Sequence, residues 1–109
     1  MITWNDFKKV EMRVGTILEA NDFADARKPA YQLIIDFGTE IGIKKSSAQL
    51  TKRYSKEDLI GKQIIAVVNF PKKQIGKFWS DCLVLGSVND GDIVLLTSDI
   101  KVENGLQIG

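Results

Sequence analysis

The chain has 109 residues, a net charge of +1, one cysteine and no histidine. This length predicts one domain, residues 1–109, and no apolar run approaches the ~20 residues of a membrane span, so we expect no membrane insertion. The missing histidine removes the commonest general base and metal ligand, and the positive charge is concentrated in residues 41–80, which carry nine basic and two acidic side chains.

The N-terminal segment predicts a short helix. Thr3 can cap it, and Trp4, Phe7 and Val10 form one apolar stripe. A helix of about two turns is marginal by itself. The stripe must therefore bury against the domain or against another copy of the chain, and periodicity leaves both open.

The next segments predict a strand, a loop and a second strand. Residues 12–20 alternate as in a strand bent at Gly15, residues 21–29 form a polar loop that ends in two cations, and residues 31–37 form another strand. Residues 38–40 are short enough for a hairpin turn into a third strand.

The third predicted strand covers residues 41–46. In it Ile43 shares a face with Lys45, and Lys44 shares the other face with Ser46. Because isoleucine should face the core, we expect Lys44 and Ser46 to face a ligand, and Lys45 to follow the core face.

Residues 47–59 predict helical turns, with Ser47 as one possible N-cap and Ser55 as a second. Residues 64–68 are a continuous apolar run, which is typical of a strand covered on both faces. The remaining elements are a strand at 82–85, a turn at 89–92, a strand at 93–96 and a tail, 98–109, with Val102, Leu106 and Ile108 as its apolar residues. This tail is expected either to form a closing hairpin or to pack on a partner subunit.

The segment from Phe70 to Trp79 has lysines and rings but no acid. Its proline and glycine argue for a loop. Phe78 and Trp79 are adjacent at the start of a strand, so one should be buried and the other exposed; Phe70 fits either the core or the surface. Lysines beside rings suit a partner with negative charge and something to stack on, although a solvated face explains a charge run equally well.

The order strand, strand, strand, helical piece, strand, strand predicts a mainly β protein with the five-stranded OB-fold barrel, a helical segment between strands three and four, an N-terminal helix and a C-terminal extension. In this fold the loops 21–29 and 70–79 lie at the mouth of the barrel beside strand 41–46. Three basic segments should therefore converge on one surface.

An enzyme is not expected. Cys82 lies in an apolar run, where it is more typical of the core than of a nucleophile. Loop carboxylates such as Asp90 and Asp92 are explained by turn formation, and no glycine-rich phosphate loop is present, so we expect no cofactor. The lone cysteine fits a reducing compartment and residues 1–6 lack a signal-peptide pattern, which favours a cytoplasmic location.

Several motifs resemble the tRNA-binding OB domain, which occurs as a stand-alone dimer and appended to methionyl-tRNA synthetases. They are Val10–Ile17, Leu33–Gly38 and Leu59–Pro71. Residues Arg27–Ala30, Ile41–Gln49 and Val68–Ile75 look more like the CsaA branch of export-related chaperones. The resemblance covers nearly the whole chain.

The resemblance implies a homodimer built from the N-terminal helix and the C-terminal tail, with interface residues Trp4, Phe7, Val102, Leu106 and Ile108. It also implies binding of unfolded or pre-secretory polypeptides and of the translocation ATPase SecA. Gly76-Lys77 and Asp81-Cys82 depart from the Arg-Gly and Gly-Met pairs of the tRNA-binding branch. These departures argue against tRNA-elbow recognition and leave peptide binding unaffected.

The sequence thus gives two functional hypotheses. The first is an ATP-independent chaperone that holds extended polypeptides, and the alternative is a protein that binds tRNA or other structured RNA. The expected contact residues are the same for both: Lys28, Lys44, Ser46, Asn69, Phe70, Lys72, Lys73, Lys77, Phe78, Trp79 and Ser80.

Overall fold

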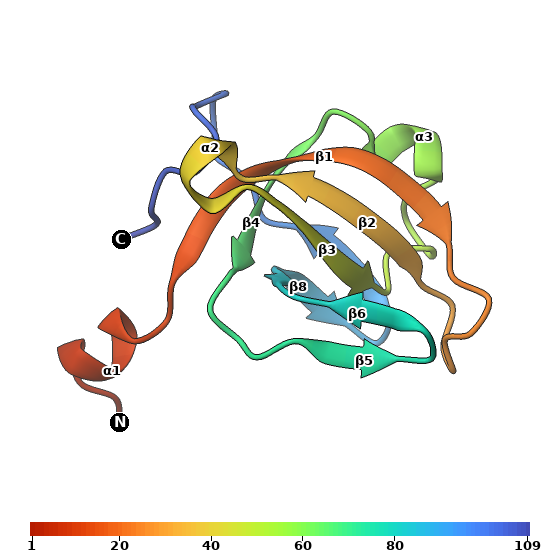
Figure 1. Ribbon diagram of the computed structural model, residues 1–109, viewed down its shortest axis with the longest axis horizontal. Helices are drawn as coiled ribbons and strands as arrows, with labels where there is room; N and C mark the ends of the chain where they lie inside the picture. Colours follow the sequence, from red (N-terminus) through yellow and green to blue (C-terminus); the bar gives the residue numbers. More distant parts are fainter.

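A computed structural model describes residues 1–109, and Figure 1 shows a curved β-structure with short helices at its margins. The elements are α1 (Trp4–Lys8), β1 (Met12–Asp22), β2 (Tyr31–Asp36), α2 (Gly38–Ile41), β3 (Ile43–Ala48), α3 (Lys56–Leu59), β4 (Gln63–Val67), β5 (Lys73–Ile75), β6 (Phe78–Ser80), β7 (Leu83–Val84), β8 (Gly86–Asn89) and β9 (Asp92–Leu95). None of these helices is long and apolar enough to cross a membrane.

The main sheet has five antiparallel strands in the order β3-β2-β1-β4-β7. Strand β1 belongs to both halves of the barrel, because Met12–Thr16 pair with β4 and Thr16–Asp22 pair with β2. The register shifts between Ile17 and Glu19, where the strand bends. This arrangement confirms the predicted OB-fold.

The core lies inside the barrel and is apolar. Alternate residues of β2, Leu33 and Ile35, are fully buried together with Phe37 just beyond its end. Gly15 allows this packing, because a Cβ atom there would lie 2.7 Å from the Phe37 ring. The ring therefore packs directly against the backbone of β1, where only glycine leaves room.

The chain between β2 and β3 differs from the predicted hairpin turn. Residues Gly38–Ile41 form the single helical turn α2, which ends at Gly42 with φ 85°. The Asp36 carboxylate starts the turn by accepting a hydrogen bond from the Gly38 N–H at 2.8 Å. The third strand consequently runs from Ile43 to Ala48, later than predicted, and Ser47 lies in this strand instead of capping a helix.

The predicted faces of β3 are wrong for the same reason. Lys44 pairs with Ile35 and Ser46 pairs with Leu33, so both belong to the core-facing side of the strand. Ser46 is 0% exposed, whereas Ile43 is 62% exposed. Side chains alternate along a strand, so the register at which β3 begins after α2 decides which alternate residues face the core. Here it is the set that contains Lys44 and Ser46.

The later predictions are confirmed in part. Ser55 caps α3 through a capping box with Asp58, and the predicted turn at 89–92 joins β8 to β9 with Gly91 at φ 85°. The segment Phe70–Trp79 is more ordered than the predicted loop, because β5 and β6 form a hairpin around Gly76, at φ 60°. Glycine readily adopts the positive φ that so tight a turn requires, and Gly76 is the residue in that position.

The tail forms no hairpin of its own and instead continues the sheet along β1 where β2 has ended. The Val14 N–H donates to the Leu106 carbonyl at 3.0 Å, and the Ile108 N–H donates to the Met12 carbonyl at 2.9 Å. The Gln63 side chain also bonds both the N–H and the C=O of Val102, at 3.0 and 2.6 Å. The tail is thereby part of the barrel wall.

The predicted N-terminal helix is present and stands away from the barrel (Figure 1). Thr3 and Asp6 form its capping box, and no residue of the helix is buried. Trp4 is 79% exposed. Within one chain, therefore, the apolar stripe does not bury against the domain.

Candidate ligand-binding mouth of the barrel

The two edges of the barrel meet where β3 lies beside the chain between β6 and β7, and we call this junction the seam. It is closed at Lys45 and open beyond Ser47. The Asp81 N–H donates to the Lys45 carbonyl at 2.9 Å, and the Asp81 carboxylate accepts from the Lys45 N–H at 2.7 Å. Beyond this point the Ser47 N–H donates only to the Ser80 hydroxyl, at 3.2 Å. Only the first of these hydrogen bonds joins two backbone groups, and side-chain oxygens provide the other two acceptors, so the backbone ladder is incomplete and the seam opens after Ser47.

Two hollows lie along the open seam. The first, of about 390 Å³, is lined by residues that include Phe70, Ser80 and Leu83, and we call it the Phe70 hollow. The second, of about 640 Å³, includes Arg27 and Lys28, and we call it the Lys28 hollow. Both hollows share the lining residues Ser47, Gln49, Lys73 and Ile75. The two hollows and the β5–β6 hairpin together form what we call the mouth.

The hairpin has two different faces. Register places Lys73 opposite Ser80 and Ile75 opposite Phe78, and these residues lie on the side of the hollows, whereas Trp79 lies on the other side. The Phe78 ring packs against Phe23 with 5.2 Å between ring centroids, and the Lys45 Nζ atom lies 5.3 Å from its centroid. Phe78 thus anchors the hairpin to the barrel.

The structure shows how far the rings of Phe70, Phe78 and Trp79 are exposed. Phe78 is half-buried, whereas Trp79 is 45% exposed, as expected for adjacent residues of a strand. Phe70 is 55% exposed at the edge of its hollow. Two large rings are therefore accessible at the mouth, and burial of further apolar surface there is favourable.

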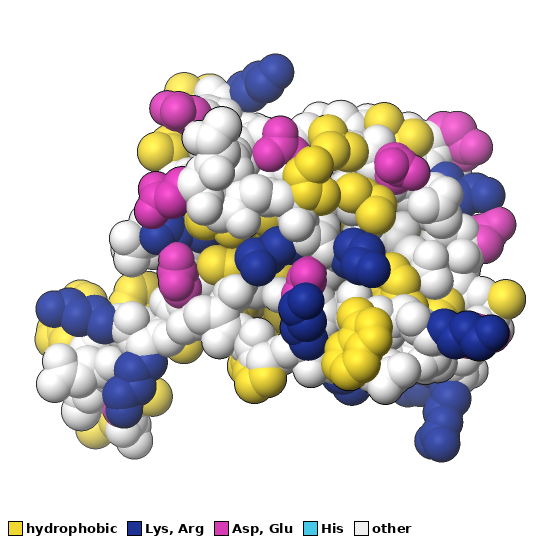
Figure 2. Space-filling view, viewed as in Figure 1, with side chains coloured by type: hydrophobic (Ala, Val, Ile, Leu, Met, Phe, Trp, Pro, Cys, Tyr) yellow, Lys and Arg dark blue, Asp and Glu magenta, His cyan; other side chains and the backbone are white.

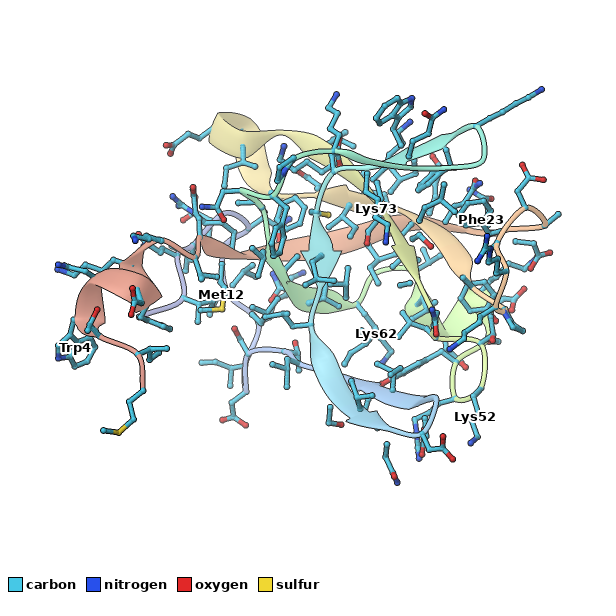
Figure 3. The ribbon with its side chains drawn as sticks, turned by 90° about the horizontal axis from the view of Figure 1, so that it is seen from below. Trp4, Met12, Phe23, Lys52, Lys62 and Lys73 are labelled. Carbon is cyan, nitrogen blue, oxygen red and sulfur yellow. The ribbon has the colours of Figure 1, made fainter.

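The cations gather at the mouth only in part. Lys28 and Lys73 line the same hollow although they are far apart in sequence, and Lys72 and Lys77 are exposed on the same hairpin. Figure 2 shows basic and apolar side chains side by side over the region of β5 and β6. Figure 3 places Lys73 toward the Phe23 end of the molecule, far from Trp4. Lys44 lies on the core side of β3 and lines neither hollow.

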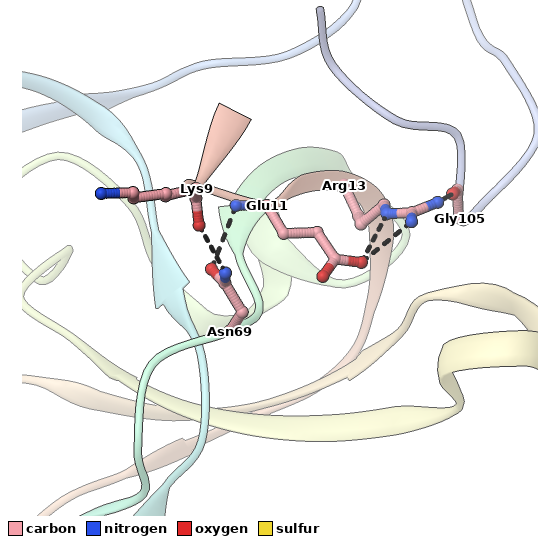
Figure 4. Close-up of polar contacts among 5 residues, drawn as sticks. All are labelled: Lys9, Glu11, Arg13, Asn69 and Gly105. Carbon is pink, nitrogen blue, oxygen red and sulfur yellow. Dashed lines mark hydrogen bonds and ion pairs between the residues drawn. The ribbon is translucent and has the colours of Figure 1, made fainter. Parts of the chain in front are cut away.

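Asn69 has a structural role in this chain. Its amide group accepts from the Glu11 N–H at 3.0 Å and donates to the Lys9 carbonyl at 2.7 Å (Figure 4). Arg13 extends the same network, since it bonds the Glu11 carboxylate at 2.9 Å and the Gly105 carbonyl at 2.9 Å. These contacts fix the connection between α1 and β1, and they occupy the amide group that we expected to face a ligand.

The candidate contact residues from the sequence did not include Ser47, Gln49 and Arg27, which line the hollows, and the seam contact of Asp81 was not expected. The Asp81 carboxylate closes the seam, so it does not project freely toward a ligand. Arg27 is adjacent to the predicted contact residue Lys28, and its positive charge could have identified it as a contact residue as well. Ser47 and Gln49 lie in the Ile41–Gln49 motif of the resemblance but had no signal in charge or periodicity, because their position in the site depends on where the barrel fails to close.

The hollows have few groups suited to acid–base or nucleophilic chemistry. Asp25 is the only carboxylate that lines either hollow. Cys82 lines the Phe70 hollow, but it is buried, and this burial raises the pKa of its thiol to about 12. At neutral pH the sulfur is therefore a neutral thiol and a poor nucleophile.

The fold and the mouth define a small OB-fold domain that presents cations and rings beside an open barrel seam. The chain belongs to the family of putative tRNA-binding domains, whose model matches residues 12–107. The matched family is a binding domain, in agreement with the lining of the mouth.

Two CsaA chaperones are among the solved structures that match over the full length of the chain. The chaperone CsaA from Bacillus anthracis str. Ames has 52% sequence identity and a TM-score of 0.95, covering 100% of this chain and 99% of that chain. The CsaA chaperone protein from Picrophilus torridus has 54% identity and a TM-score of 0.94, covering 100% of both chains.

Curated relatives include methionine–tRNA ligases. The enzyme from Caldanaerobacter subterraneus subsp. tengcongensis is 36% identical over 107 residues, which are 98% of this chain and 16% of that protein. The chain thus spans about one sixth of the length of the curated relatives it matches.

Proposed function

We propose that this chain is an ATP-independent chaperone that works as a homodimer and holds unfolded or pre-secretory polypeptides at the mouth of its barrel. The observation that carries the proposal is the continuous lining from Lys28 through Lys73 to Phe70, which surrounds an open seam. Such a surface offers apolar contact and positive charge without strict shape, which suits weak binding of many clients.

The rings favour a polypeptide over a purely ionic ligand. Phe70 and Trp79 are both large and substantially exposed; Phe70 lines its hollow, and Trp79 lies on the hairpin outside both hollows. Identity of 52–54% over full length to two CsaA chaperones supports the same function. The binding of SecA, which the resemblance implies, stays a prediction.

The homodimer rests on α1 and the chain ends. Ile2, Trp4 and Phe7 line a hollow of about 630 Å³ together with the C-terminal Gly109. A five-residue helix is too short to be stable without packing, and this one buries nothing in its own chain. A second copy packed there would cover the exposed apolar stripe. Of the predicted interface residues in the tail, Leu106 and Ile108 are bonded along β1 and Val102 is bonded to Gln63.

A second candidate function is the binding of tRNA or other structured RNA. It is favoured by the family match over residues 12–107 and by the convergence of Lys28, from the loop after β1, and Lys73, from β5, on one hollow. Lysines there would contact phosphates, and exposed rings would stack on bases.

Fluorescence anisotropy with a permanently unfolded polypeptide, reduced and carboxymethylated lactalbumin, tests the proposal. We expect binding that the double substitution Phe70→Ala and Trp79→Ala weakens by about tenfold, through the loss of apolar burial. Ile60→Ala is the matched control, because Ile60 is an exposed apolar residue beside α3. Binding of labelled tRNA alone, with none of the polypeptide, would select the second function.

Sedimentation velocity tests the dimer. Replacing Trp4 and Phe7 with alanine should convert the dimer to a monomer, because these side chains form the exposed stripe of α1. The Ile60→Ala protein should sediment as the dimer. A double variant that is still dimeric would show that the interface lies elsewhere.

A further inference from the structure

The edge of β3 beyond the seam contact has main-chain groups that point away from β2. In an antiparallel strand, successive residues direct their N–H and C=O groups to opposite edges. The N–H and C=O groups of Lys45 both point to Asp81. Those of Ser47, two residues later, point to the same edge of β3, at a place where no neighbouring strand pairs with it.

These groups are only weakly engaged within the chain. The Ser47 N–H donates to the Ser80 hydroxyl at 3.2 Å, and its carbonyl accepts from the Ser46 hydroxyl at 3.2 Å, both at the long limit for a hydrogen bond. Gln49 makes no main-chain hydrogen bond with the protein. The free edge is therefore available to a strand from outside.

The space beside this edge fits an extended chain. Ser47 and Gln49 line the Phe70 hollow, the Lys28 hollow and a third hollow of about 420 Å³. The third is mainly apolar and includes Leu83 and Ile93. A strand added at the edge would direct every second side chain toward these hollows and the others toward solvent.

We propose that a captured polypeptide adds as a strand to the edge of β3 at Ser47–Gln49 and is held there by main-chain hydrogen bonds. Its apolar side chains would lie in the Phe70 hollow and in the third hollow, both of which Leu83 lines. The inference rests on the proposed chaperone function. It specifies a peptide backbone as the common feature of the clients, since main-chain pairing gives affinity while the hollows give only mild preferences.

The charges around the edge specify the occupant further. Arg27, Lys28 and Lys73 lie at one end of the seam, with Asp25 as the one opposing carboxylate. The other end is apolar. An extended chain with acidic residues at one end and aliphatic residues after them matches this gradient, and it will bind in one direction.

Backbone methylation of a peptide tests strand addition without altering the protein. The probe is a fluorescein-labelled peptide of about eight residues, with glutamates at one end followed by alternating leucine and threonine. Two forms carry N-methyl groups at odd or at even positions. Only one set of amides faces β3, so one form should lose about tenfold or more in affinity while the other stays within about threefold of the parent.

The outcomes separate the inference from the function on which it rests. Equal affinities of the two methylated peptides, whether high or low, would overturn strand addition while leaving the chaperone function in place if the parent peptide binds. Failure of the parent peptide and of unfolded lactalbumin to bind would overturn the proposed function itself.

A protein variant gives an independent readout. Ser80→Ala removes the hydroxyl that competes for the Ser47 N–H, so affinity for the parent peptide should rise about threefold. Ser87→Ala, which removes a hydroxyl bonded to the Val94 carbonyl in the β8–β9 hairpin, should leave it unchanged. Equal affinities of the two variants would contradict pairing at Ser47.

Discussion

The two sides of the barrel are built differently. In the wall formed by β1, β2 and β4, continuous backbone ladders join the strands and the enclosed side chains are apolar and fully buried. At the mouth, one backbone hydrogen bond from Asp81 and the side-chain oxygens of Asp81 and Ser80 close the seam, and the lining mixes cations with exposed rings. The wall therefore provides most of the stability, and the mouth retains unpaired groups that a ligand can use.

This difference explains why a single substitution can act on one property and spare the other. Burial in the wall is complete, so a lost side chain leaves a cavity. At the mouth the same change alters a solvated surface, whose contribution to stability is small. Substitutions in the wall should therefore lower the free energy of unfolding more than substitutions at the mouth.

Phe37→Ala should lower the free energy of unfolding by about 3–5 kcal/mol, because Phe37 is fully buried against Gly15 and Ile35. Trp79→Ala is the matched removal of a ring at the mouth, and it should change stability by no more than ~0.5 kcal/mol. Urea denaturation of both variants measures the contrast. Similar losses in the two proteins would mean that the mouth is as much a part of the core as the wall.

Asp81→Ala should lower the free energy of unfolding by about 1–3 kcal/mol, because it leaves the partly buried Lys45 N–H without its acceptor. Asp81→Asn keeps an acceptor oxygen at that position and should cost less than ~1 kcal/mol. Thermal denaturation of the pair gives both values. If the asparagine variant loses as much as the alanine variant, the charge and not the seam hydrogen bond is what matters at this position.

The sequence was sufficient to predict the buried strands of the wall. Alternation in residues 31–37 and the apolar run 64–68 identified buried strands, since side-chain period and burial are local properties of the sequence. The order of the predicted strands and of the helical piece between strands three and four then indicated the OB-fold barrel, and the family resemblance agreed with it. Adjacent rings at Phe78 and Trp79 were correctly expected to differ in exposure, because neighbouring strand residues point to opposite faces.

The mouth was predictable only in outline. The faces of β3 were assigned wrongly, because a helical turn at Gly38–Ile41 and a hairpin turn have similar sequences and opposite effects on register. The open seam at Ser47 depends on which backbone groups lack a partner across the barrel. That is a property of tertiary pairing, which neither the periodicity nor the charge of the sequence around Ser47 indicates.

The most direct test of the division between rings and cations is the double charge reversal Lys72→Glu and Lys73→Glu, with Lys52→Glu as the control on another part of the surface (Figure 3). Affinities for labelled tRNA and for a neutral, leucine-rich peptide are measured over a range of salt concentrations. Our account predicts that binding of tRNA falls by at least about tenfold, with a shallower salt dependence, whereas binding of the peptide changes by less than about threefold. An equal loss of both ligands would contradict it.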